Sequence, residues 1–194
     1  MAHRVFFALW PDDAPRDAAV QLRSRYSAPG RDVPRAHLHL TLAFAGTVSE
    51  AQVATLQQAA NAIDAAPFSL TLDRLDGFDA AGVQWLGPSR APESLTALVA
   101  QLQTVCREAG IALPDEPFRP HLTLRRRVTQ PVRMAVPAVA WHVHDFALIE
   151  SGSAGRPGAY RVQARWPLRP EPRSCAALRH RWHAERELVA TVAE

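Results

Sequence analysis

The tetrapeptide His39-Leu-Thr-Leu42 occurs a second time, unchanged, as His121-Leu-Thr-Leu124. Successive side chains of a β-strand point to opposite faces, so in each copy the histidine and the threonine face one way and the two leucines the other. If the leucines enter a hydrophobic core, each His/Thr pair must face out of it. The repeat therefore predicts two similar halves that bring two imidazoles and two hydroxyls to one small cavity.

The segments around the two copies support this internal repeat. In both halves a helical pattern and a proline-containing loop precede the copy, and Ser49 with Gln52 has the spacing of a capping box. Strands are predicted at residues 3–9, 37–44, 68–75, 83–86, 121–126, 142–150 and 160–166, and helices at 12–26, 49–64 and 92–109. Strands and helices that mix without regular alternation favour an α+β fold. We expect two pseudo-symmetric lobes, with antiparallel sheets flanked by helices, around a central groove.

The chain changes in composition near its C-terminal end. Arg169-Pro-Glu-Pro-Arg173 has the character of a linker, and Ser174 is placed to cap a last helix to about residue 190. We therefore predict a two-lobed domain at residues 1–168, followed by a linker and an accessory helix at 169–194. Packing of this helix on the domain is favoured over binding of a partner.

The paired motifs suit acid–base chemistry at a phosphate group. Histidine has an ordinary pKa near 6.5, so His39 and His121 can serve one as base and the other as acid. The hydroxyls of Thr41 and Thr123 can donate hydrogen bonds to phosphate oxygens, and an arginine can neutralise charge that develops in the transition state. Arg126 is the best candidate for that arginine, provided that the strand ends or bulges near residue 125.

Other residues near the motifs have alternative interpretations. His37 alternates with His39, but no cysteine or carboxylate stands nearby in the sequence to complete a zinc site, so no metal site is predicted. His142 and His144 are expected on a strand surface. Phe44 and Phe118 lie close to the two motifs, where an aromatic ring can stack on a base, although core packing is the favoured role for both.

The residues quoted so far resemble a known family. The two His-Leu-Thr-Leu motifs, Arg119-Pro before the second motif and Arg126 after it are similar to the two-histidine phosphoesterase superfamily. Within it, the chain resembles the RNA 2′,3′-cyclic phosphodiesterases, also called 2′-5′ RNA ligases, over residues 3–168. Ala45-Gly46, where the family often has Leu-Gly, and the basic run Arg125-Arg126-Arg127 depart from the pattern without changing a histidine or a threonine.

The resemblance implies a fold, an activity and a set of site residues. It implies a two-lobed α+β fold that hydrolyses RNA 2′,3′-cyclic phosphate ends to 2′-phosphates, with reversible 2′-5′ joining of tRNA halves. It implies no metal or nucleotide cofactor. His39 and His121 carry over as the catalytic pair, with Thr41 and Thr123 as their motif partners and Arg126 as the phosphate-binding residue. We assign His39 to protonate the leaving O3′ and His121 to activate the water.

Composition sets further bounds and leaves alternatives open. The chain has 194 residues, 47% of them hydrophobic, a net charge of +3 and no apolar run near the roughly 20 residues that a membrane span needs. We expect a monomer that acts in the cytoplasm on RNA and not at a membrane. A phosphodiesterase for another cyclic phosphate or for 2′-5′-linked oligonucleotides, and a non-catalytic module that binds RNA ends, stay open as alternatives.

Overall fold

The computed structural model describes residues 2–152 and 160–170. The strands are β1 (Ala2–Leu9), β2 (Arg31–Asp32), β3 (Leu40–Ser49), β4 (Phe68–Phe78), β5 (Val83–Gly87), β6 (Leu122–Arg126), β7 (Met134–Val143), β8 (Asp145–Ser151) and β9 (Tyr160–Pro167). The helices are α1 (Asp13–Arg25), α2 (Glu50–Ala60) and α3 (Glu93–Glu108), with a 3-10 turn η1 (Arg35–His37) before β3. The predicted accessory helix lies outside the described residues.

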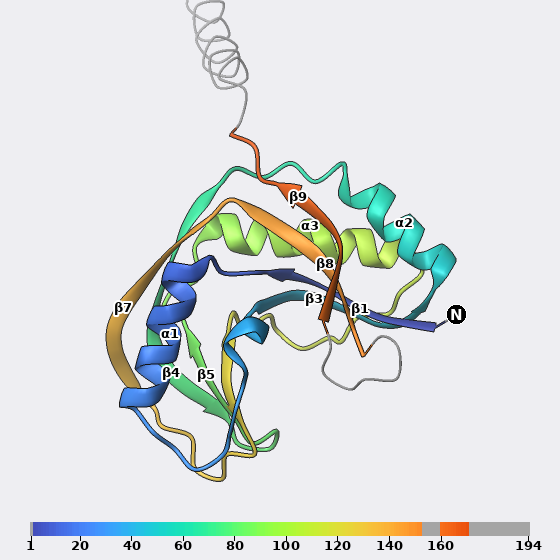
Figure 1. The fold of residues 1–194 in the computed structure, drawn as a ribbon. Coiled ribbons are helices and arrows are strands. Elements are labelled where there is room, and N and C mark those ends of the chain that lie inside the picture. The colour runs from blue at the N-terminus through green and yellow to red at the C-terminus, as the bar shows by residue number, and fades with distance from the viewer. Residues whose placement is uncertain (1, 153–159, 171–194) are drawn as a thin grey trace, which may run out of the picture.

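All nine strands belong to one antiparallel sheet. Its order is β7-β4-β5-β6-β3-β1-β8-β9, and the short β2 pairs with the free part of β6. The two strands that carry the motifs, β3 and β6, are neighbours in the middle of this order. Figure 1 shows β7, β4 and β5 on one side and β1, β8 and β9 on the other, with η1 between them. The α+β class and the antiparallel pairing are as predicted.

The sheet can be divided into two groups of four strands, β3-β1-β8-β9 and β6-β5-β4-β7, and these groups do not correspond to the two halves of the sequence. Strands from both ends of the chain build the group β3-β1-β8-β9, whereas the middle of the chain builds β6-β5-β4-β7. The helices also cross over, because α1 packs on β6 and β7, and α3 packs on β3. The predicted lobes are thus joined by a shared sheet and by α1 and α3, each of which covers strands of the other group, whereas α2 packs on β1 and β3.

One hydrophobic core lies between the sheet and the three helices. It takes residues of alternate positions from the strands, such as Val5, Phe7 and Leu9 of β1, together with the buried faces of α1, α2 and α3. A second, smaller cluster around Phe6 and Ala8 lies on the opposite face of β1. The helices therefore cover one face of the sheet, and the other face is left for the site.

Several predicted boundaries were wrong. Strand β3 begins after His37, which belongs to η1, and it continues past Gly46, whose φ of +75° is accommodated within the strand. The helix that begins at the confirmed Ser49/Gln52 capping box ends at Ala60 and not near residue 64. Strand β2 and most of β7 were not predicted; β7 has exposed residues at many positions and includes a proline.

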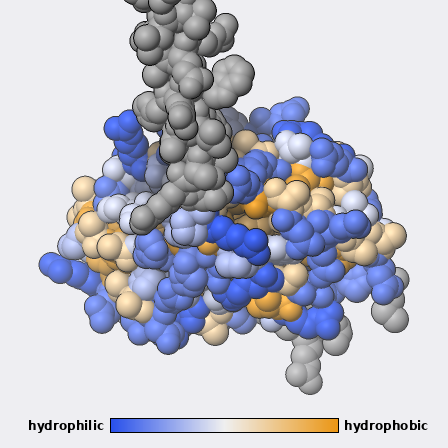
Figure 2. Space-filling view, turned by 90° about the horizontal axis from the view of Figure 1, so that it is seen from above, coloured by the Kyte–Doolittle hydropathy of each residue, from blue (hydrophilic) through white to orange (hydrophobic). Residues whose placement is uncertain are grey.

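The described surface is mostly polar. Hydrophilic residues cover most of the face seen in Figure 2, with hydrophobic residues in smaller separate groups. Among the described residues, Phe44, Met134 and Val162 are the large hydrophobic side chains that are exposed. None of the described helices is both long enough and apolar enough to pass through a lipid bilayer.

Candidate active site

The two motifs meet at the central seam of the sheet. Strands β3 and β6 pair through Leu40 and Leu122, the second residues of the two tetrapeptides. Both leucines are buried in the core, so the residues on either side of them point to the opposite face. By the same antiparallel register, each histidine lies opposite the threonine of the other motif: His39 opposite Thr123, and His121 opposite Thr41. The site is therefore a square of four polar side chains, two from each motif.

The two histidines are held by the same local hydrogen bond. His39 and His121 each stand one residue before their strand, and each Nδ1 lies 2.7 Å from the backbone carbonyl oxygen two residues earlier, that of His37 and that of Arg119. A carbonyl oxygen only accepts, so in the neutral ring Nδ1 donates the proton and Nε2 carries the lone pair. Both rings therefore have a free Nε2 for proton transfer.

His39 is enclosed by aromatic rings. Trp10 stacks on it with ring centroids 5.4 Å apart and an interplanar angle of 7°, Phe6 lies 5.0 Å away, and Tyr160 meets it edge-on at 5.3 Å. Burial, together with the charge of Arg126, lowers the pKa of His39 to about 4, although the hydrogen bond to the carbonyl oxygen of His37 acts in the opposite direction. His39 is thus neutral at pH 7 when no ligand is bound.

His121 has its own aromatic neighbours. Phe78 lies edge-on to it at 5.0 Å, and Trp85 lies 6.2 Å away. Burial lowers the pKa of His121 also, and Arg126 acts in the same direction. The segment before it is closely packed, because a Cβ on Gly87 would lie 2.6 Å from the carbonyl oxygen of Pro120. Only glycine at this position of β5 leaves room for the backbone that carries His121.

A β-bulge brings Arg126 to the site. Gln84 pairs with Arg125 and Trp85 with Thr123, so Leu124 is an extra residue in β6. Leu124 and Arg125 are consequently both buried, and Arg126 returns to the face of Thr123. Arg126 lines the same cavity as His39 and Thr123. Arg126 was predicted to reach the site if the strand ended or bulged near residue 125, and the structure has a bulge at Leu124.

The first motif carries the same bulge. Phe7 pairs with Ala43 and Ala8 with Thr41, so Leu42 is the extra residue in β3. Phe44 then occupies the position after its histidine that Arg126 occupies after His121. Phe44 is 39% exposed and lines a cavity with His121, so the expectation of core packing was wrong for this residue. Phe118 is partly buried against the core and lines the same cavity.

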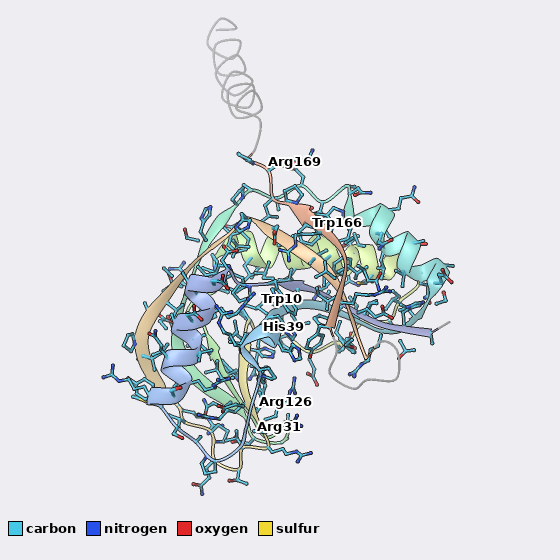
Figure 3. All side chains as sticks on the ribbon, in the orientation of Figure 1. Trp10, Arg31, His39, Arg126, Trp166 and Arg169 are labelled. Atoms are coloured by element: carbon cyan, nitrogen blue, oxygen red, sulfur yellow. The ribbon has the colours of Figure 1, made fainter. Side chains whose placement is uncertain are left out.

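The two cavities on either side of the histidines differ in chemical character. The cavity beside His39, of about 330 Å³, has two arginines, one aspartate, two histidines and a threonine in its walls, together with three less polar residues: Arg31, Asp32, His37, His39, Thr123, Arg126, Val33, Pro34 and Tyr160. The cavity beside His121, of about 620 Å³, is largely apolar, with Phe44, Phe78, Leu113, Pro114, Pro117 and Phe118 among its walls. In Figure 3, Trp10, His39, Arg126 and Arg31 follow one another down the middle of the molecule. One end of the site thus suits anions and the other suits flat apolar groups.

Sequence reasoning missed several of these residues. Trp10 lies between the predicted strand at residues 3–9 and the predicted helix at 12–26, and Tyr160 belongs to the strand farthest from His39 in the chain. Arg31 falls in a predicted loop and belongs to no motif, whereas in the structure it lies in β2, which pairs with β6. Short β-pairings between distant segments leave little periodic signal in one sequence, so only the fold reveals these contacts.

The described residues include no group of three or more metal-binding side chains that could hold an ion. His37 lines the cavity beside His39, but its ring lies edge-on to Tyr160 at 4.8 Å. His142 is exposed on β7, and His144 is exposed beside Asp12 and Asp145.

A pair of His-x-Thr motifs that meet at the seam of one antiparallel sheet defines the two-histidine phosphoesterase class. The sequence profile of the 2′-5′ RNA ligase superfamily matches residues 11–155, and the chain belongs to this superfamily. The resemblance stated from the motifs is thereby confirmed.

Relatives and solved structures agree with this family. The chain is 33% identical over 169 residues to the RNA 2′,3′-cyclic phosphodiesterase of Escherichia coli, an alignment that covers 85% of this chain and 96% of that protein. It is 30% identical over 183 residues to the RNA 2′,3′-cyclic phosphodiesterase of Thermus thermophilus, covering 87% and 91%. The fold is similar to the crystal structure of E. coli LigT complexed with 3′-AMP, with a TM-score of 0.80 and 31% identity over 88% of this chain and 100% of that one.

Proposed function

We propose that this protein is a phosphodiesterase that hydrolyses the 2′,3′-cyclic phosphate at the end of an RNA to a 2′-phosphate. The observation that carries the proposal is the square of His39, Thr41, His121 and Thr123, in which both histidines turn a free Nε2 away from the backbone. The two relatives named above bear this activity in their names. A module that only binds phosphate gains nothing from two partly buried neutral imidazoles, because guanidinium groups bind anions more strongly.

The reaction needs one proton removed and one proton supplied. The base takes a proton from water, the hydroxide oxygen bonds to phosphorus, the bond from phosphorus to O3′ breaks, and the acid protonates O3′. We keep His121 as the base and His39 as the acid, although both are neutral in the free protein. A bound phosphate carries negative charge, which raises the pKa of a nearby imidazole and favours the protonated acid.

The other site residues have matching tasks. Thr41 and Thr123 donate hydrogen bonds to the non-bridging phosphate oxygens, and Arg126 neutralises the charge that develops on them. The terminal base stacks in the aromatic cavity beside His121, against Phe44 or Phe78. No step requires a metal or a nucleotide cofactor.

The reaction is tested with EDTA-treated protein and a short RNA that ends in a 2′,3′-cyclic phosphate, with the product's phosphate position identified by NMR. We expect complete conversion to the 2′-phosphate. A 3′-phosphate product would reverse the regiochemistry, and no conversion by folded protein would reject this substrate class.

The assignment of acid and base has its own test. A cyclic phosphate with sulfur in place of O3′ expels a thiolate, which needs far less help from an acid than an alkoxide does. With this substrate, His39→Ala is expected to recover most of its lost activity, whereas His121→Ala is not. The opposite result would exchange the two roles.

A second activity is favoured by one observation: cavities lie on both sides of the histidine pair. A 2′-5′ phosphodiester has a nucleoside on each side of its phosphate, and the two cavities together accommodate both. We propose weak reversible 2′-5′ joining, with tRNA halves as natural substrates, by a monomer in the cytoplasm. Cleavage of a 2′-5′-linked dinucleotide tests the chemistry, and absence of cleavage would restrict the enzyme to cyclic phosphates.

A further inference from the structure

Two arginines form a direct cross-strand pair at the anion-binding end of the site. Arg31 of β2 is the register partner of Arg126 of β6, so their side chains leave the sheet on the same face. Both are exposed, and both line the cavity beside His39. Figure 3 shows Arg31 next to Arg126 on the side away from His39. The guanidinium of Arg31 therefore lies farther from His39 than that of Arg126 does.

The described part of the chain places no paired carboxylate against these two arginines. Among residues 2–152 and 160–170, no carboxylate forms an ion pair with Arg31 or Arg126. Asp32 lines the cavity, but its oxygens are engaged elsewhere, by Arg125 Nε at 2.6 Å and Arg23 Nε at 3.3 Å. Like charges directly opposite each other in a sheet are destabilising. The arrangement thus favours binding of an anion.

A buried brace fixes the position of Arg31. The guanidinium of Arg125, only 6% exposed, donates to Asp32 and to the carbonyl oxygens of Arg23 and Tyr26. This ties the strand that carries Arg31 to the end of α1. The approach is close, since a Cβ on Gly30 would lie 2.9 Å from the carbonyl oxygen of Arg126. Arg31 is therefore preorganised beside Arg126 and not placed on a free loop.

One arginine is enough for the reacting group, because a cyclic phosphate carries a single negative charge. The next anion in an RNA is the phosphodiester on the 5′ side of the terminal nucleotide. We propose that Arg31, paired with Arg126, binds this second phosphate, so that the enzyme selects RNA ends over free cyclic nucleotides. The inference rests on the proposed function and adds to it the recognition of the neighbouring phosphate.

The test compares two substrates that differ by one phosphate, cytidine 2′,3′-cyclic phosphate and its 5′-phosphorylated form. We expect the wild type to have a kcat/KM about tenfold higher for the 5′-phosphorylated form, as one charge-assisted contact provides. Arg31→Gln is expected to remove this preference, and Arg31→Lys to keep part of it. Arg90→Gln is the matched control, because it removes the same charge from an exposed position outside the cavity.

Equal losses on the two substrates in Arg31→Gln would overturn the inference, because they would place Arg31 at the reacting phosphate. An unchanged kcat/KM of Arg31→Gln on both substrates would overturn the inference as well. Binding of the two products, cytidine 2′-phosphate and cytidine 2′,5′-bisphosphate, is measured by calorimetry in parallel. The bisphosphate is expected to bind about tenfold more tightly to the wild type but not to Arg31→Gln. If neither cyclic substrate is turned over, the proposed function fails while this binding comparison still decides the role of Arg31.

Discussion

At the scale of single residues, the two motif histidines share a backbone contact and differ in their surroundings. Each donates Nδ1–H to a carbonyl oxygen two residues earlier. His39 is stacked on Trp10, whereas His121 meets Phe78 edge-on beside the larger cavity. Two identical tetrapeptides thus give two imidazoles with different environments, as a reaction with one acid and one base requires.

Replacement of either histidine tests whether the proposed pair is catalytic. We expect His39→Gln and His121→Gln each to lower kcat by about 10²- to 10⁴-fold, the usual contribution of one acid or base. His142→Gln, on the exposed face of β7, is the control and should leave kcat unchanged. Activity is measured on the 2′,3′-cyclic RNA end, with folding checked by circular dichroism. Near-normal turnover in either motif variant would reject the two-histidine scheme.

The lowered pKa values predict an acidic optimum for kcat/KM. Activity needs one neutral and one protonated imidazole, and kcat/KM reports the free enzyme. Because the pKa of His39 is about 4 and that of His121 is also lowered, kcat/KM should peak below about pH 6.5 and fall as the pH rises. The bound phosphate raises both pKa values, so kcat should peak at higher pH. Rate profiles from acid to alkaline buffer measure both, and a kcat/KM maximum above neutrality would contradict the prediction.

The same burial makes stability depend on pH. His39 titrates near 6.5 in the unfolded chain and at about 4 in the folded protein, so protonation favours unfolding. The contribution of neutral His39 to the free energy of unfolding is fully present above pH 6.5. About 3 kcal/mol of this stability is lost as the pH falls towards 4. Urea unfolding at neutral and acid pH should show that His39→Gln loses less unfolding free energy on acidification than the wild type does. An equal loss in both would mean that other groups control acid unfolding.

At the scale of elements, a bulge at the fourth residue of each motif shapes the site. The extra residues Leu42 and Leu124 allow two consecutive side chains to point into the core, and the next one returns to the open face. That next residue is Phe44 in β3 and Arg126 in β6. The same backbone device therefore presents an aromatic ring at one cavity and a cation at the other.

The approach of β5 to the second motif gives a prediction at this scale. Gly87→Ala would place a methyl group against the carbonyl oxygen of Pro120 and displace the backbone that holds Nδ1 of His121. We expect a loss of about 1–3 kcal/mol in unfolding free energy, as for other overpacked sites, and a fall in kcat larger than the fall in substrate affinity. Denaturant unfolding and steady-state kinetics measure the two effects. Unchanged kcat in a destabilised variant would show that the segment is not needed to position His121.

At the scale of the whole molecule, the square of the four motif side chains depends on a seam that is one residue pair wide. Leu40 and Leu122 are the register pair that joins β3 to β6, while the crossed packing of α1 on β6 and β7 and of α3 on β3 links the two strand groups. Distant parts of the chain thus hold the motifs in register. The core behind the seam, rather than the seam itself, positions the four side chains.

A shortened chain tests how much of the molecule is needed. The backbone N–H groups of Leu168 and Arg169 donate to His144 and Ala65, so the described domain is tied down to this point. A chain that ends at residue 170 is expected to retain the fold and turnover within about threefold, because it keeps the described core residues up to Leu168. Thermal unfolding and assay on the cyclic RNA end compare it with the full chain. Loss of folding or a large loss of turnover would assign the last residues to the domain.

The sequence by itself determined the residues at the centre of the site and the class of fold. The repeated His-Leu-Thr-Leu places alternating side chains on opposite faces, and this local rule is enough to predict two outward His/Thr pairs and to require that the strand end or bulge near residue 125 if Arg126 is to reach the site. The tertiary structure alone decided that each histidine lies opposite the other motif's threonine, that Arg31 stands beside Arg126, and that Trp10 and Tyr160 enclose His39. The reason is physical: alternation is a property of one strand, whereas register, pairing and ring contacts join segments far apart in the chain, whose association the core selects.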